Sequence, residues 1–202
     1  MAKQELQFWF EFASTYSYLS AMRVQEVADK AGVSVSWHPF WLGPIFKSQG
    51  WDSSPFNLFP VKGQYMWRDM ARICKARGLP LVHPEPFPQN GILAARTALL
   101  ALRDPGGPEF CRAVYAAEFG EGKTISDPDL IRALLERCGL SPARVDEAGT
   151  EPAKAALKDK VAKAMELGIF GAPSFVVGDE LFWGDDRLDD ALDWARGLGS
   201  GG

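Results

Sequence analysis

The spacing of apolar residues changes twice within the first forty positions. The run LQFWFEF, residues 6–12, is almost wholly apolar, as is typical of a strand buried on both faces of a sheet. Apolar side chains then recur at helical spacing from about Tyr16 to Ala31, and Gly32 is a natural C-terminal stop. Residues 33–42, VSVSWHPFWL, have the pattern of a second strand. A strand, helix and strand of this length predict a right-handed βαβ unit with parallel strands.

The middle of the chain has helical periodicity and carries no strand signal. A loop rich in glycine, proline and serine comes first, over residues 43–60, and loops of this length are usually functional. Amphipathic helices are predicted after it, with Asn90 and Asp127 as N-caps of two of them. Their sequences are KGQYMWRDMARICKARG, NGILAARTALLALRD, PEFCRAVYAAEFGEG, DPDLIRALLERCG and EPAKAALKDKVAKAMELG.

Strand signals return only near the C-terminus. SFVVG and LFWG predict a hairpin over residues 174–184, and the segment DRLDDALDWARGL predicts a last helix. The element order is therefore β-α-β, a helical block, and β-β-α. This order predicts an α/β thioredoxin-like fold with a helical insertion. Residues 1–44 and 168–202 are expected to form the thioredoxin-like domain, and residues 45–167 the inserted helical domain.

Composition narrows the classes of function. The chain has 202 residues and a formal net charge of -4, without a basic run, so nothing indicates a nucleic-acid or membrane partner. No apolar stretch reaches the roughly 18 residues of a membrane span, and MAKQELQFWF lacks the features of a signal peptide, which predicts a cytoplasmic protein. The 3 cysteines are distant from one another and the 2 histidines do not pair with them, so no metal site is expected.

Candidate chemistry lies at the first strand–helix junction. In FEFASTYSYLS, residues 10–20, Ser14 and Ser17 stand at the start of the predicted helix with two residues between them. That is the position of the Cys-x-x-Cys pair in thioredoxin-like redox proteins, but both sulfurs are absent. A serine here is either a plain helix N-cap or a hydrogen-bond donor to a thiolate brought by another molecule.

Four segments carry a resemblance to a known family. They are FEFASTYSYLS, FPVKGQYMWRD, PFPQNGILAARTALLAL and FGAPSFVVGDELFWGDDRLDD. Together they resemble the DsbA-like thioredoxin superfamily, and within it the 2-hydroxychromene-2-carboxylate isomerases and the related kappa-class glutathione transferases. The resemblance spans nearly the whole chain.

The resemblance implies glutathione as cofactor and gives roles to five residues. Ser14 is expected to be the catalytic serine, which donates a hydrogen bond to the glutathione thiolate. Ala172 and Pro173, a cis proline in such folds, are expected to pair with the cysteinyl backbone. Asp185 and Asp186 are expected at the γ-glutamyl end, with a helix N-cap as the alternative role for each.

The resemblance also implies a substrate site. Lys62 matches a lysine that could hold a carboxylate, with a solvated surface lysine as the alternative. The family asparagine that precedes this lysine has two candidates here, Asn57 and Ser53. Asn90 is either a substrate contact or only a helix cap. Thr15 departs from the proline that commonly follows the serine.

Three functions remain open on the sequence. The first is a glutathione-dependent isomerase that interconverts 2-hydroxychromene-2-carboxylate and trans-o-hydroxybenzylidenepyruvate in aromatic degradation. The second is a kappa-like transferase that consumes glutathione, and the third is a non-catalytic thioredoxin-fold binding or chaperone-like protein. The expected partner is a small aromatic carboxylate, and the oligomeric state, including a homodimer, stays open.

Overall fold

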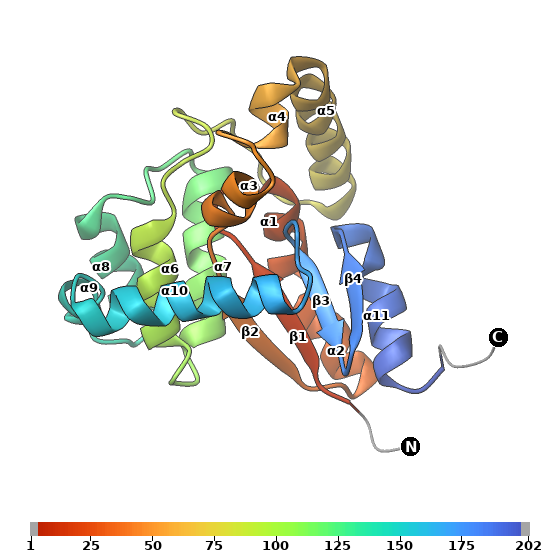
Figure 1. Cartoon of the computed structure of the whole chain (residues 1–202). Helices are drawn as coiled ribbons and strands as arrows, with labels where there is room; N and C mark the ends of the chain where they lie inside the picture. The colour runs from red at the N-terminus through yellow and green to blue at the C-terminus, as the bar shows by residue number, and fades with distance from the viewer. Residues whose placement is uncertain (1–3, 199–202) are drawn as a thin grey trace.

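The computed structural model describes residues 4–198 and contains a four-stranded mixed sheet in the order β2-β1-β3-β4 (Figure 1). β1 (Leu6–Phe10) pairs in parallel with β2 (Val35–Pro39). β3 (Ser174–Val177) pairs antiparallel with both β1 and β4 (Glu180–Trp183). The predicted βαβ unit, the C-terminal hairpin and the thioredoxin-like fold with a helical insertion are thus confirmed.

Helices fill the connections between the strands. Their bounds are α1 Thr15–Ala21, α2 Val24–Ala31, α3 Gly43–Ser48, α4 Pro55–Leu58, α5 Pro60–Arg77, α6 Ile92–Ala101, α7 Gly107–Tyr115, the π-helical turn η1 Ala116–Gly120, α8 Pro128–Arg137, α9 Arg144–Glu147, α10 Glu151–Glu166, the 3-10 turn η2 Asp185–Arg187 and α11 Leu188–Ala195.

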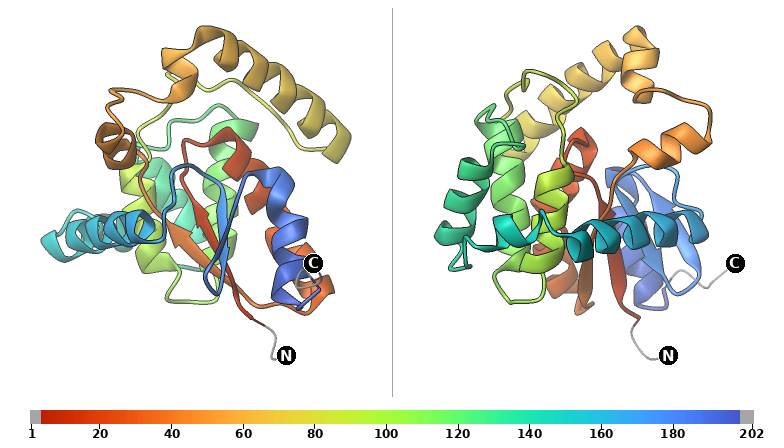
Figure 2. Two further views of the ribbon diagram at one scale, coloured as in Figure 1. Left: turned by 45° about the vertical axis from the view of Figure 1, so that its right-hand side comes forward. Right: turned by 60° about the vertical axis from the view of Figure 1, so that its left-hand side comes forward.

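Both faces of the sheet are covered, because side chains alternate along β1. Phe8 and Phe10 contribute to the larger apolar core, which also contains side chains of α1, α7, α8 and α11. Trp9 contributes to a smaller core on the other face, where Val161 of α10 and Ile45 of α3 pack. Figure 2 shows α10 on one side of the sheet and α1, α2 and α11 on the other. The larger core joins strands and inserted helices, and the division into two domains stays a prediction.

Two predicted elements differ from those observed. The helix expected from Tyr16 to Ala31 is broken into α1 and α2, with Arg23 at the break, where its guanidinium donates to the Asp185 backbone oxygen at 2.7 Å. The loop expected over residues 43–60 contains the short helices α3 and α4, each with a proline in its first turn.

One edge of the sheet gathers the segments from which the candidate site is built. Phe10 at the end of β1 pairs with Pro39 at the end of β2, and Ser174 at the start of β3 pairs with both Trp9 and Trp183. The N-terminus of α1, the loop before β3 and the turn after β4 therefore meet at this edge. α4 and α5 lie above it in Figure 1.

Candidate functional site

Ser14 occupies the N-cap position of α1. Its backbone is extended (φ -90°, ψ 115°), and its hydroxyl oxygen accepts a hydrogen bond from the Ser17 backbone N–H at 3.2 Å. The same hydroxyl donates to the carbonyl oxygen of Ala172 at 2.9 Å, across 158 positions of sequence. Ser14 is only half-buried. It is therefore a helix cap and also faces the loop before β3, so the two roles predicted for it are compatible.

The loop before β3 lies against the end of β4. The Ala172–Pro173 peptide bond is cis, as expected, and the Pro173 carbonyl oxygen accepts from the Gly184 N–H at 3.0 Å. A Cβ on Gly171 would lie 2.5 Å from the indole nitrogen of Trp183, so the ring in this position requires the absence of a side chain at residue 171. The rings of Phe170 and Trp183 are tilted at 58° to each other with their centroids 4.9 Å apart, and both residues are about half exposed beside the loop.

Asp185 is buried at the centre of an ion-pair network. Its carboxylate accepts from both terminal nitrogens of Arg77, the closer at 2.6 Å, from the Ser20 hydroxyl at 2.9 Å and from Arg23 Nε at 3.4 Å. These contacts join α5, α1 and η2. They account for both carboxylate oxygens without a ligand, and the role of Asp185 in cofactor binding stays a prediction.

Asp186 differs from its neighbour in exposure. Its side chain is 74% exposed, and its one ion pair joins it to Arg187 of the same turn at 3.2 Å. Gly184, with φ of 113°, and its bond to Pro173 carry this turn back toward the cis-proline loop. Of the two aspartates predicted at the γ-glutamyl end, Asp186 is the one with oxygens accessible to a ligand.

Lys62 lies near the start of α5, and α5 packs on α1. The Thr15 hydroxyl donates to the sulfur of Met66 at 3.2 Å, and the Tyr16 hydroxyl donates to Asp69 at 3.0 Å. Lys62 lies one helical turn before Met66, is exposed, and has its ammonium 4.8 Å from the centroid of the Phe59 ring. Thr15 stands where the family commonly has proline, and its hydrogen bond to Met66 joins α5 to the start of α1.

Asn90 lies beside the residues that precede Ser14. Its side-chain oxygen accepts from the Ile92 backbone N–H at 3.1 Å, but the N-cap of α6 is Gly91 and not Asn90 as predicted. A Cβ on the adjacent Gly91 would lie 3.3 Å from Phe12 and 3.8 Å from the Ala13 nitrogen. Asn90 is exposed, so this bond leaves the amide nitrogen accessible.

Asn57 and Ser53 contact each other rather than the Ser14 region. The amide of Asn57 donates to the Ser53 hydroxyl at 3.1 Å on the exposed side of α4. The two candidates for the family asparagine are therefore parts of one small hydrogen-bonded turn. Their role in substrate binding stays a prediction.

Two carboxyls, of the half-buried Glu11 and the fully buried Glu118, are absent from the sequence-based set. Glu11 follows β1, and burial raises its pKa to about 7, although the Leu42 backbone opposes this by hydrogen bonding. Glu118 is fully buried in η1, and its carboxyl has no hydrogen-bond partner among the described residues. Burial first, and the charge of Glu11 second, raise the pKa of Glu118 well above its ordinary value. The sequence contained one signal of the burial of Glu118, because this residue lies on the same helical face as Phe110 and Val114.

Within residues 4–198, no cluster of three or more His, Cys, Asp or Glu side chains is arranged to hold a metal ion. No helix in the same span is both long and apolar enough to cross a membrane. Cys74 and Cys111 are buried and Cys138 is half-buried, and all three are free thiols. Burial raises the pKa of each of these thiols, so none has the character of a reactive thiolate.

Comparison with known proteins agrees with this geometry. Residues 5–193 match the DSBA-like thioredoxin domain. A 2-hydroxychromene-2-carboxylate isomerase of Sphingobium xenophagum is 30% identical over 186 residues, which cover 91% of this chain and 94% of the relative. A protein of the same name from Pseudomonas putida is 25% identical over 185 residues, covering 91% of this chain and 90% of the relative.

A solved 2-hydroxychromene-2-carboxylate isomerase superposes with a TM-score of 0.84 at 26% identity, over 95% of this chain and 94% of that one. A probable DsbA oxidoreductase from Streptomyces coelicolor, at 19% identity and a TM-score of 0.75 over 96% of this chain and 90% of that one, shares the fold. The chain belongs to the DSBA-like thioredoxin family and, within it, to the 2-hydroxychromene-2-carboxylate isomerase family.

Proposed function

We propose that this protein is a glutathione-dependent isomerase that interconverts 2-hydroxychromene-2-carboxylate and trans-o-hydroxybenzylidenepyruvate. The observation that carries the proposal is the contact of Ser14 with Ala172, which places a hydroxyl beside the backbone of a cis-proline loop. The names and coverage of the isomerase relatives support the same reaction. Ser14 and Ser17 carry no sulfur, which argues against disulfide exchange at this junction.

The donor set around Ser14 fits the parts of glutathione. The Ala172 backbone is available for β-type pairing with a cysteinyl backbone. When the cysteinyl N–H takes over the Ala172 oxygen, the Ser14 hydroxyl is released from its 2.9 Å bond and can turn toward the thiol. Asp186, exposed at the start of η2, is positioned for the ammonium of the γ-glutamyl end.

Ser14 then acts as a hydrogen-bond donor rather than as a nucleophile. A hydrogen bond to a charged group contributes about 1.5–3 kcal/mol, and a change of 1 in pKa corresponds to 1.36 kcal/mol. One such bond would lower the pKa of a bound thiol by about 1–2. Glutathione, when bound, supplies the thiolate that adds reversibly to the conjugated double bond of the opened substrate and so permits its rotation.

Lys62 and Phe59 fit an aromatic carboxylate. Lys62 has no carboxylate partner within residues 4–198, and Phe59, whose ring it contacts, is 48% exposed. A planar substrate could stack on the ring while its carboxylate pairs with the ammonium. Asn90 offers an amide on the opposite side, from the segment beside Ala13.

A spectrophotometric assay tests the proposal. The protein is mixed with 2-hydroxychromene-2-carboxylate with and without glutathione, and the absorbance of the trans product is followed. Turnover only with glutathione, and full recovery of the thiol afterward, is the expected result. Steady loss of the thiol would indicate a kappa-like transferase, and no turnover at all would overturn the proposal.

A further inference from the structure

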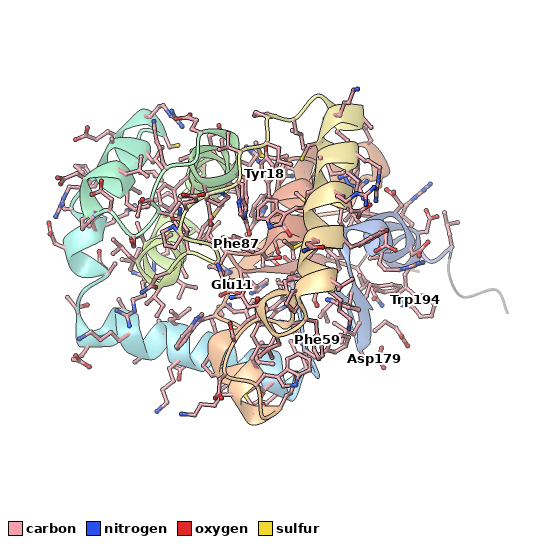
Figure 3. The ribbon with its side chains drawn as sticks, turned by 90° about the horizontal axis from the view of Figure 1, so that it is seen from above. Glu11, Tyr18, Phe59, Phe87, Asp179 and Trp194 are labelled. Carbon is pink, nitrogen blue, oxygen red and sulfur yellow. The ribbon has the colours of Figure 1, made fainter. Side chains whose placement is uncertain are left out.

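Glu11 is held at the sheet edge where the site is built. It is the first residue after β1, and its backbone oxygen accepts from the Tyr115 hydroxyl at 2.8 Å and from the Ser14 N–H at 3.1 Å. The main chain is therefore fixed from two sides at this point. Seen from above in Figure 3, Glu11 lies near the middle of the face, between the ribbons of α5 and α6.

The protein surrounds the Glu11 carboxyl, but no cationic side chain within residues 4–198 forms an ion pair with it. The Glu11 residue as a whole is half-buried, and the protein surrounds its carboxyl closely enough for burial to raise its pKa to about 7. It forms no ion pair within residues 4–198, whereas Asp185 at the same edge is bound by two arginines. A carboxyl of a half-buried residue that has no cationic partner is able to exchange a proton with a ligand placed beside it.

The ionisable groups that face Glu11 add no positive charge. Tyr115 and Glu118 come from α7 and η1, and Leu42, immediately before α3, contributes its backbone. Burial keeps Tyr115 protonated, and burial together with the Glu11 charge keeps Glu118 neutral. Glu11 is therefore the member of this cluster that releases its proton first, as expected for coupled carboxyls in different environments.

We propose that Glu11 is the acid–base group that opens the hemiketal ring of the substrate before the double bond rotates. The Glu11 carboxylate removes the proton of the 2-hydroxyl, and the O–H electron pair forms the ketone C=O. The bond between C2 and the ring oxygen breaks, and its electron pair stays on that oxygen as a phenoxide. Glu11 then returns the same proton to the phenoxide, so the step needs no other reactant.

This inference rests on the proposed substrate but not on glutathione, and the test exploits that difference. The saturated analogue 2-hydroxychroman-2-carboxylate opens and closes in the same way but has no conjugated double bond to accept a thiolate. Exchange between its cyclic and open forms is measured by NMR exchange spectroscopy with the protein present and glutathione absent. The wild-type protein should accelerate exchange, with a rate that rises with pH through about 7.

Four variants locate the effect. Glu11→Gln should lower the protein-dependent exchange rate about 100-fold or more and remove the pH dependence, and Glu11→Asp should recover part of both. Glu118→Gln, a buried carboxyl of the same cluster, and Glu136→Gln, an exposed one on α8, should retain both. An unchanged Glu11→Gln profile, or its loss in Glu118→Gln instead, would overturn the proposal.

A second measurement needs no substrate. In protein labelled with carbon-13 at the glutamate carboxyls, one resonance should titrate near pH 7 and should vanish in Glu11→Gln. If no glutamate titrates above pH 5.5, the inference is wrong whatever the protein turns over. If the analogue exchanges as expected but 2-hydroxychromene-2-carboxylate is not isomerised with glutathione, the proposed function fails while the role of Glu11 stands.

Discussion

The Ser14 hydroxyl donates a hydrogen bond to the Ala172 carbonyl oxygen and simultaneously accepts one from the Ser17 N–H. The first bond joins the start of α1 to the cis-proline loop, and the second caps the helix. A bound cysteinyl backbone would compete for the Ala172 oxygen, so ligand binding and the orientation of the Ser14 hydroxyl are coupled. Ser14 therefore contributes to stability in the free protein and, under the proposed function, to thiol activation in the complex.

Ser14→Ala should separate these two contributions. Loss of the cap should lower the free energy of unfolding by about 0.5–2 kcal/mol, as measured by urea denaturation. Turnover should fall about 10–100-fold, because a charged hydrogen bond of about 1.5–3 kcal/mol is lost, and should partly recover as pH rises. The thiolate absorbance of bound glutathione at neutral pH should decrease.

Glutathione affinity provides the control for Ser14→Ala. Calorimetry should find most of the affinity retained, because the backbone of Ala172 and the Asp186 carboxylate are unchanged. If the thiolate absorbance and turnover both stay at wild-type levels, Ser14 is a helix cap alone.

The sheet and the position of Ser14 could be predicted because they depend on local patterns. An apolar run, a helical stripe and a hairpin signal each lie within a short segment, and their order leaves few topologies. Lys62 and Asn90 could be assigned only through the family resemblance. The packing of α5, which carries Lys62, on the start of α1 depends on contacts such as Thr15 with Met66, which join residues 51 positions apart.

Asp185 and Glu11 show what local patterns omit. From the sequence alone, an aspartate at the start of a helix is expected to be a helix cap or a ligand-binding residue. In the structure the Asp185 carboxylate is instead paired with Arg77, 108 positions away. From the sequence alone, a glutamate that follows an aromatic strand is expected to be solvated. Its enclosure depends on Tyr115 and on the loop after β2, which the sequence does not place.

Asp185→Asn should destabilise the fold. The Asp185 side chain is 5% exposed, so neutralising it leaves Arg23 and Arg77 without their shared partner. Loss of one partner of a buried ion pair typically costs 3–5 kcal/mol. Because these arginines retain 21% and 31% exposure, we expect about 2–3 kcal/mol by urea denaturation. Asp189→Asn, at a site 71% exposed, should change stability by less than about 0.5 kcal/mol.

Asp186→Ala, unlike Asp185→Asn, should leave stability nearly unchanged and should weaken glutathione binding. Its side chain is 74% exposed and pairs only with Arg187 among residues 4–198, so the melting temperature should change little. Glutathione affinity measured by calorimetry should fall about 10-fold or more, the effect of losing one charged hydrogen bond. Asp190→Ala, on the same turn of chain, is the matched control and should bind normally. Unchanged affinity in Asp186→Ala would place the γ-glutamyl site elsewhere.

His38 should make the fold sensitive to mild acid. Its Nδ1 lies 2.8 Å from the Lys160 ammonium and its Nε2 lies 2.9 Å from the Ser36 hydroxyl, so the ring is neutral and accepts from the lysine. Burial, and secondarily the Lys160 charge, lower the pKa of His38 to about 4. The unfolded chain, with an ordinary pKa near 6.5, takes up the proton first.

The effect of His38 on stability should therefore be absent above about pH 6.5 and should lower stability as pH decreases toward 4, by on the order of 3 kcal/mol. Urea denaturation across this range measures the slope. His38→Gln should lose stability less steeply than wild type, while His83→Gln, at an exposed ring, should follow wild type. Equal slopes for His38→Gln and wild type would show that the acid sensitivity arises from other groups.

Glu118 should give a pH dependence of the opposite sign. Its carboxyl is fully buried without a partner among the described residues, and its pKa is raised well above 4.5 by burial and then by the Glu11 charge. The folded protein therefore holds a proton that the unfolded chain releases above about pH 4.5. By linkage, this carboxyl progressively reduces stability as pH rises from that point toward its raised pKa.

Glu118→Gln keeps the size of the protonated side chain but cannot ionise. Any cost of burying the amide is the same at every pH, so the informative quantity is the slope of stability against pH and not its absolute value. We expect the variant to gain stability relative to wild type continuously from about pH 5 to pH 8, measured by urea denaturation. Glu136→Gln, exposed on α8, should run parallel to wild type. A parallel course for Glu118→Gln as well would mean that Glu118 is ionised in the folded protein and paired by groups that move toward it in solution.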